Sequence, residues 1–349
     1  MEDSEIHARE FDQTIKRVNY NNSWHSVGVW MDSLQNDVIN GLKENKWPQI
    51  FVPILFEKDA VQVLFKEAKL NRLVSILLDM NDVLPLHPDL SFDIVWRTFE
   101  ITLHMYHKEF DRQSSSKSLT ESERIAQQNR KDSTPVTDLL VRVSDSVFSR
   151  LLSRNKDLHN SIESLIGEKI SISALRFVSQ RMFFVSTINI NSDEKQMNER
   201  SKERLGVELY NDLRDKYVKE NTIDAGNLRN LTLLLKKIMK GEEVMIAEKR
   251  KYKLSLKERI DFVTDCILFT SRCERFHGDY FSPFKSERNS LRNVYQYYWQ
   301  TLVAYTFFWL FICCYCEKKG LPEIVKIESV VNSVNGTLER MNAILNNSI

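Results

Sequence analysis

Glycine and proline are scarce in this chain, which has nine and seven of them among 349 residues. β-Sandwiches with many turns and α/β folds with glycine-rich loops use more of both residues, so the scarcity favours an all-α fold. A surplus of positive charge is also lacking, because 49 lysines and arginines face 48 acidic residues. This balance excludes the bulk basic field of many nucleic-acid-binding proteins, so any contact with RNA must be local.

The chain also lacks the features of a secreted or metal-binding protein. Its five cysteines are Cys266, Cys273, Cys313, Cys314 and Cys316. Three of them lie within four residues, which does not suit a disulfide framework, and no second ligand pair follows at zinc spacing. No P-loop, GxGxxG, GxSxG or HExxH motif occurs, and the opening MEDSEIHAREFDQ has no secretory signal pattern. We therefore expect a cytoplasmic protein with reduced thiols and with neither metal nor cofactor.

Hydrophobic residues recur at helical spacing through most of the chain. We expect the main helices at residues 24–38, 90–112, 136–152, 227–240, 256–275 and 323–345. The same pattern continues through Val61, Leu64 and Phe65, and residues 196–220 are so highly charged that we expect an exposed helix there. The predicted fold class is therefore all-α.

Residues 111–135 differ from the sequence on either side. Serine, glutamine and charged residues dominate this stretch, which we interpret as a flexible linker. The sequence thus predicts two helical domains, at residues 1–110 and 136–349. The first domain offers no recognisable chemistry, so we assign it to sensing or regulation, with a regulatory protein as its partner.

Residues 295–316, YQYYWQTLVAYTFFWLFICCYC, carry no charge and are long enough to span a bilayer. Five tyrosines, two glutamines and two threonines make a poor surface for lipid, so we do not expect a membrane protein. Two interpretations remain. The segment can fill the core of its own helix bundle, or it can form the interface of a homodimer through the C-terminal domain.

One short segment, SRCERFHGDYFSPF at 271–284, combines residues that can do chemistry. Ser255 and Glu258 form a capping-box pattern that predicts the beginning of a helix, and Gly278 is suited to end it. Arg272 and His277 then fall in its last turns. They can be cations that interact with the helix dipole. They can equally be a reactive pair, since histidine titrates near neutral pH and arginine matches phosphate oxygens.

The residues RCERFHG at 272–278 resemble the signature of the HEPN superfamily (higher eukaryotes and prokaryotes nucleotide-binding). In this family the motif is Arg-x4–6-His, often ending in Phe-His-Gly, and it lies in an all-α bundle. Many members are metal-independent ribonucleases of toxin or antiviral defence systems. The resemblance covers residues 136–349, although its specific part is about seven residues. It implies that Arg272 and His277 are catalytic and that two copies of the motif meet in a homodimer.

A second pair, Arg154 and His159, has the same spacing, so the pattern by itself does not select the site. Active family members often carry a polar residue after the arginine, which Asn155 supplies and Cys273 does not. Tyr280 also lies three residues after the histidine, where regulated members have a tyrosine two residues after it. We prefer Arg272 and His277 because the flanking Phe-His-Gly matches the motif only there.

RNA cleavage needs no metal, because the 2′-OH beside the scissile phosphate is itself the nucleophile. A histidine can move the proton, and an arginine can stabilise the added charge. The expected products are a 2′,3′-cyclic phosphate and a 5′-OH. As RNA-binding residues we expect basic side chains near the motif and in the densest basic segment: Lys249, Arg250, Lys251, Lys285 and Arg288. The alternative function is a catalytically inactive HEPN-like scaffold.

Overall fold

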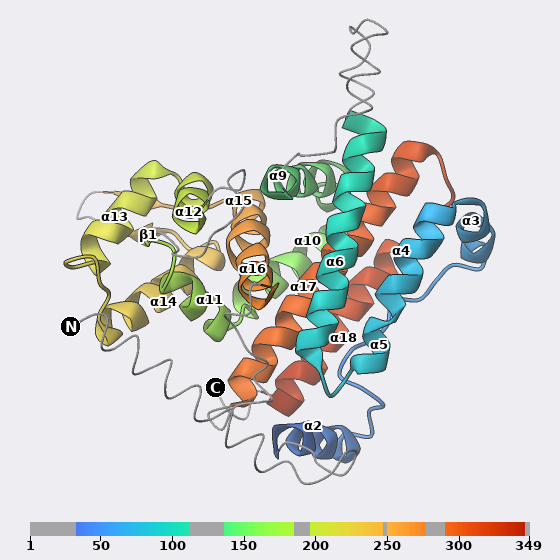
Figure 1. Cartoon of the computed structure of the whole chain (residues 1–349), viewed down its shortest axis with the longest axis horizontal. Helices are drawn as coiled ribbons and strands as arrows, with labels where there is room; N and C mark the ends of the chain where they lie inside the picture. Colours follow the sequence, from blue (N-terminus) through green and yellow to red (C-terminus); the bar gives the residue numbers. More distant parts are fainter. Residues whose placement is uncertain (1–32, 112–135, 185–195, 247–249, 277–289, 346–349) are drawn as a thin grey trace, which may run out of the picture.

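The computed structural model describes residues 33–111, 136–184, 196–246, 250–276 and 290–345. These residues are predominantly helical, as Figure 1 shows, so the all-α prediction is confirmed. The helices of the first half are α2 (Ser33–Glu44), α3 (Ala60–Lys66), α4 (Ala68–Leu78), α5 (Met80–Val83), α6 (Pro88–Tyr106), α9 (Val136–Val147), α10 (Lys156–Glu163) and α11 (Ile172–Ser179). Those of the second half are α12 (Met197–Leu205), α13 (Val207–Tyr217), α14 (Ala225–Met239), α15 (Leu256–Asp261), α16 (Phe269–Phe276), α17 (Leu291–Lys319) and α18 (Ile327–Leu345).

Short π-helical segments extend several of these helices. They are η1 (His107–Asp111), η3 (Phe148–Leu152), η4 (Ser164–Glu168) and η5 (Phe262–Leu268). The described strands are β1 (Val244–Met245) and β2 (Lys251–Tyr252), which pair antiparallel with Val244 opposite Tyr252. The sheet is therefore a minimal hairpin, attached to the helix that follows it.

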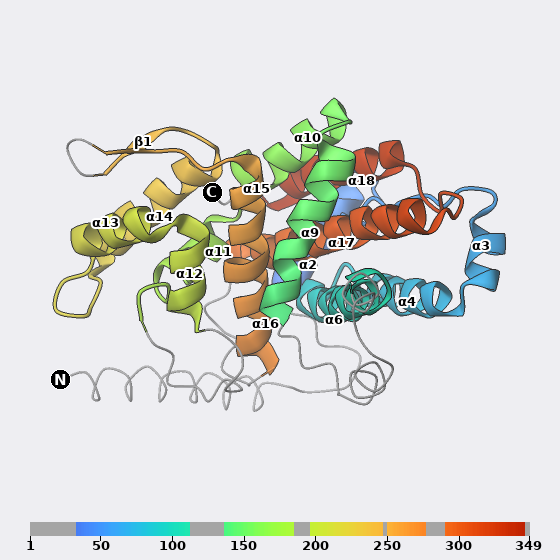
Figure 2. The ribbon, with the colours of Figure 1, turned by 90° about the horizontal axis from the view of Figure 1, so that it is seen from above.

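Helix α17 is the centre of the molecule. It lies between α6 and α18 (Figures 1 and 2), and 94% of its most apolar window is buried within the chain. Among the described helices it is the one long and apolar enough to cross a membrane, a test that the core helix of a soluble protein also passes. Of the two interpretations left open by the sequence, the structure shows the intramolecular core.

The polar side chains of α17 explain why its sequence is uncharged but not purely apolar. The Trp299 indole donates to the carbonyl of Leu165 at 2.8 Å, and the Tyr298 hydroxyl donates to the carbonyl of Pro85 at 2.6 Å. The Gln300 amide donates to the Ser271 hydroxyl at 2.8 Å. Each of these three donors therefore exchanges water for a protein acceptor, as buried polar groups require.

The segments on either side of residues 112–135 share one hydrophobic core. Helix α6, from the predicted N-terminal domain, packs along α17 from the predicted HEPN-like domain (Figure 1). Phe99 of α6 and Phe308 of α17 are both fully buried in the same cluster. The division into two domains stays a prediction, and the described residues on its two sides pack together.

The helix of the motif begins as predicted. The Ser255 hydroxyl accepts from the Glu258 amide at 3.3 Å, and the Glu258 carboxylate accepts from the Ser255 amide at 2.7 Å. These reciprocal bonds satisfy two amides that a helix start leaves without partners. Segments α15, η5 and α16 then run on without a break from Leu256 to Phe276.

The helix expected through Val61, Leu64 and Phe65 is present as α3, although two of these residues do not lie on its buried face. Val61 and Phe65 are 75% and 88% exposed, because Ala60 and Val63 form the buried face of α3. The charged stretch 196–220 is two helices rather than one exposed helix. Gly206, with a φ of +81° that disfavours other residues, separates α12 from α13. Hydrophobic periodicity did not identify the buried face of α3, because a helix of seven residues has too few turns to define one.

Candidate functional site at the end of α16

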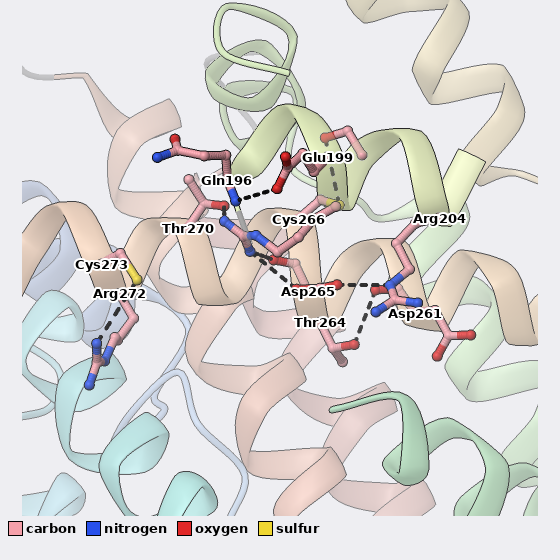
Figure 3. Close-up of polar contacts among 12 residues, drawn as sticks. Gln196, Glu199, Arg204, Asp261, Thr264, Asp265, Cys266, Thr270, Arg272 and Cys273 are labelled. Atoms are coloured by element: carbon pink, nitrogen blue, oxygen red, sulfur yellow. Dashed lines mark hydrogen bonds and ion pairs between the residues drawn. The ribbon is translucent and has the colours of Figure 1, made fainter. Parts of the chain in front are cut away.

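Arg272 lies near the C-terminal end of α16 and is held by α6. Its guanidinium forms an ion pair with the Glu100 carboxylate of α6 at 3.4 Å. The two side chains keep 23% and 21% of their surface exposed, so the pair is accessible from solvent. Figure 3 shows Arg272 and Cys273 away from the polar cluster around Asp265. The structure thus places the predicted catalytic arginine at a surface between two packed helices.

Arg275, three residues further on, is more deeply buried and more strongly held. Its guanidinium donates to both carboxylate oxygens of Asp93, at 2.8 Å and 2.6 Å, and lies 3.5 Å from the Asp89 carboxylate. The same group lies over the ring of Tyr297, 5.3 Å from its centre. Burial disfavours its charge, but the hydrogen bonds to Asp93 outweigh that cost and raise the pKa of Arg275 above its usual range. Arg275 therefore anchors α16 to α6.

The other motif residues of α16 also have structural roles. Glu274 is almost buried and forms an ion pair with Arg181, which follows α11. Cys273 is 8% exposed and belongs to the hydrophobic core. The small apolar side chain at this position is therefore explained by packing, since a polar residue there would face the core. Packing thus explains why this chain has Cys273 at the position where active members of the resembled family often carry a polar residue.

His277, Gly278 and Tyr280 lie outside the described residues, as do Lys249, Lys285 and Arg288. The pairing of Arg272 with His277 therefore stays a prediction. The acidic residues that hold the motif were missed by the sequence reasoning. Asp93 and Glu100 are seven residues apart, which places them on one face of α6. The sequence spacing therefore indicated an acidic face on α6, but it did not indicate that α16 is the partner of that face.

The alternative pair, Arg154 and His159, contacts acidic residues. The Arg154 guanidinium lies 3.4 Å from the Glu317 carboxylate near the end of α17, and its side chain is 68% exposed. The His159 ring lies 4.0 Å from the Glu163 carboxylate, one turn along α10. The Asn155 side chain caps α10 by accepting from the Leu158 amide at 2.9 Å. The polar residue that made this pair attractive is thus a helix cap.

Two of the predicted RNA-binding residues lie far from Arg272. Arg250 precedes β2 and Lys251 belongs to it, so both lie before the start of the helix that carries Arg272 near its other end. At about 1.5 Å per residue, residues 256–272 separate them by roughly 24 Å or more. Arg250 also lies 3.6 Å from Asp212, and Lys251 lies 2.8 Å from Glu243. The structure therefore does not bring these cations together with the motif.

A buried polar cluster beside the motif is structural. Arg200 of α12 is 2% exposed and lies 3.1 Å from the Asp265 carboxylate and 3.1 Å from the Thr270 hydroxyl. Arg204 reaches the same carboxylate at 2.8 Å (Figure 3). These contacts fasten α12 to η5 and α16. With Asp265 1% exposed, the cluster has no access for a substrate.

Buried cysteines of this chain are poorly suited to act as nucleophiles or metal ligands. All five are free, and no group of three or more His, Cys, Asp or Glu side chains that could hold a metal occurs in the described part of the chain. Burial raises the pKa of Cys266 and of Cys314 to about 12. Thiols with such pKa values stay protonated at neutral pH and are poor metal ligands.

Comparison of the chain with protein-family models, with curated proteins and with solved structures gave no match. The HEPN resemblance therefore rests on the residues RCERFHG.

Proposed function

We propose that this protein is a metal-independent endoribonuclease of the HEPN type, with Arg272 and His277 as its catalytic residues. The observation that supports the proposal is the setting of Arg272. Its guanidinium is held near the end of a long helix by Glu100, and part of its surface remains open to a substrate. A cation that is both positioned and accessible is what stabilisation of a transition state requires.

The chemistry follows from the two side-chain types. The imidazole of His277 accepts the proton of the 2′-OH, and the 2′-oxygen forms a bond to phosphorus. The guanidinium of Arg272 stabilises the charge added to the phosphoryl oxygens. The bond from phosphorus to the 5′-oxygen then breaks, and that oxygen takes up a proton. The products are a 2′,3′-cyclic phosphate and a 5′-OH.

A homodimer is part of the proposal, because proton transfer at both the attacking and the leaving oxygen is served by two copies of the motif. The dimer has to use a surface other than residues 295–316, since these are buried within the chain. Light scattering at micromolar protein concentration measures the mass, and a monomeric mass removes the two-copy site.

The biological setting that accompanies this activity is cytoplasmic, in a toxin or antiviral defence system. Residues 1–110 would restrain the nuclease, alone or with a protein partner. The contact of α6 with Arg272 through Glu100 supports this role, because α6 belongs to that region.

The decisive experiment measures cleavage of mixed RNAs in EDTA by the wild-type protein and by His277→Ala. We expect cyclic-phosphate products from the wild-type protein alone. Cleavage that needs a divalent metal, or that persists in His277→Ala, contradicts the proposal.

A catalytically inactive HEPN-like scaffold is the second candidate. The observation that favours it is again Glu100, whose carboxylate already neutralises Arg272 and competes with a phosphate for it. Absence of cleavage by the wild-type protein on every RNA tested supports the scaffold.

A further inference from the structure

A groove of about 750 Å³ lies between α4 and α6. Four basic side chains line it: Lys69, Arg72, Arg97 and Lys108. Its apolar lining comes from Leu73, Ile76, Ile101 and Met105. The volume is in the range of ordinary ligand sites, and the lining combines cations with an apolar surface.

The four cations of this groove have no close ionic partner among the residues that the structure describes. None of the four forms an ion pair with an acidic side chain of the described residues, whereas Arg272, Arg275 and Lys319 nearby all do. The acidic residue that lines the groove is Glu109, and its carboxylate is engaged by Lys319 at 2.9 Å and by the Tyr315 hydroxyl at 2.8 Å. Burial alone raises its pKa, but these hydrogen bonds and the charges of Lys319 and Lys69 lower the pKa of Glu109 below its usual value. With four cations and one carboxylate in its lining, the groove therefore carries a net positive charge.

The positive charge forms an elongated strip. Arg97 and His104 are seven residues apart and share one face of α6, and Lys108 continues the lining of the groove from η1. From Arg97 of α6 to Lys108 of η1 the chain rises about 16 Å, while Lys69 and Arg72 of α4 line the other wall. At roughly 3.4 Å of axis per nucleotide of a stacked strand, this length covers about five nucleotides. The shape suits an extended polyanion better than a single compact anion.

Helix α6 connects this strip to the candidate catalytic arginine. Figures 1 and 2 show α4 and α16 on opposite sides of α6. Glu100, which holds Arg272, is one turn from both Arg97 and His104. A strand in the groove therefore has only the width of α6 to cross before it reaches Arg272.

We infer that the groove between α4 and α6 binds single-stranded RNA and directs it to Arg272. Phosphates contact the four cations, and the guanidinium planes of Arg72 and Arg97 and the apolar lining receive the bases. This inference rests on the proposed nuclease function, which supplies the reason for RNA rather than an acidic peptide. It is also consistent with the near-zero net charge of the chain, because the basic surface is confined to one groove.

The test measures binding of a fluorescein-labelled 12-nucleotide uridine RNA carrying 2′-O-methyl groups. Such a probe cannot be cleaved by 2′-OH attack, so binding is read independently of catalysis. The full-length wild-type protein is compared with Arg72→Ala/Arg97→Ala by fluorescence anisotropy from 50 to 200 mM salt. Both arginines are exposed, so the fold is expected to persist, and circular dichroism checks it.

We expect the double variant to bind at least tenfold more weakly. The slope of log affinity against log salt should shrink by about 1.4, because a single strand contributes about 0.7 per phosphate contact. The matched control Lys43→Ala/Lys202→Ala removes two exposed lysines outside the groove and should bind like the wild-type protein.

Unchanged binding by the groove variant overturns the inference, and so does an equal loss in the control or no binding by the wild-type protein. Displacement of the probe by a 12-residue polyglutamate at equal concentration also overturns it, in favour of an acidic protein partner. Cleavage of unmodified RNA is scored separately. If the groove result holds but wild-type protein cleaves nothing, RNA binding stands and the nuclease proposal falls.

Discussion

The Arg272 guanidinium and the Glu100 carboxylate lie 3.4 Å apart, across the contact between α16 and α6. This ion pair joins the RCERFHG motif to the part of the chain that we assigned to regulation. A displacement of α6 would move the partner of Arg272, so the pair is a direct physical link between the two regions. Substitutions should distinguish residues that hold α16 against α6 from residues that act on RNA.

Arg272→Lys should lower RNA cleavage about 100-fold, because an ammonium keeps the charge but loses the planar fork that matches phosphate oxygens. The variant should keep its fold, since the pair with Glu100 is partly exposed and contributes at most about 1 kcal/mol. Initial rates on one labelled RNA and a thermal unfolding curve measure the two effects. A fully active Arg272→Lys protein would remove Arg272 from the mechanism.

Arg154→Ala and His159→Ala should both leave cleavage unchanged. Arg154 is a 68% exposed partner of Glu317, and His159 interacts with Glu163 one turn away on its own helix. The same rate assay, run beside His277→Ala, decides between the two pairs. An inactive His159→Ala protein together with an active His277→Ala protein would transfer the site to α10.

Arg275→Ala should destabilise the protein by about 3–5 kcal/mol, because it leaves the carboxylates of Asp89 and Asp93 without their buried cation. Arg272→Ala, three residues earlier, should cost about 1 kcal/mol or less. Urea unfolding of the two variants makes the comparison within one helix. Equal losses of stability would show that the depth of the Arg275 contact has no energetic consequence.

Asp265→Asn should cost about 3–5 kcal/mol of stability, since Arg200 and Arg204 then keep their charges beside a neutral amide. Asparagine has nearly the same shape, so the loss reports charge rather than packing. The urea midpoint checks the prediction, with Asp212→Asn as a control at a carboxylate near the surface. A midpoint that does not move would mean that the cluster contributes nothing net.

Stability should fall at alkaline pH. Burial raises the pKa of Tyr295 and Tyr305 to about 12, from 10.0, and that of Cys266 to about 12, from 9.0. Above pH 9 the unfolded chain therefore binds fewer protons than the folded chain, and the free energy of unfolding decreases with pH. The stability is fully present below pH 9 and is lost as the pH approaches about 12. Urea midpoints from pH 8 to 11 measure this loss, and a flat profile contradicts it.

The local parts of the fold were predictable from the sequence. The capping box of Ser255 and Glu258 lies within four residues, and the helix begins at Leu256, as this pattern predicted. The uncharged segment 295–316 was recognised as an element to be buried, because its composition leaves no charge for water. Hydrophobic periodicity also identified the helices that became α6, α14 and α18.

The partners of these elements were decided by the tertiary structure. Arg272 and Glu100 are 172 residues apart in the chain, and Arg275 and Asp93 are 182 apart. Periodicity states that a side chain is buried but not against which helix, so it could not choose between a dimer interface and an intramolecular core for α17. The basic groove between α4 and α6 could not be predicted from the sequence for the same reason. Its cations come from separate segments of the chain that only packing brings together.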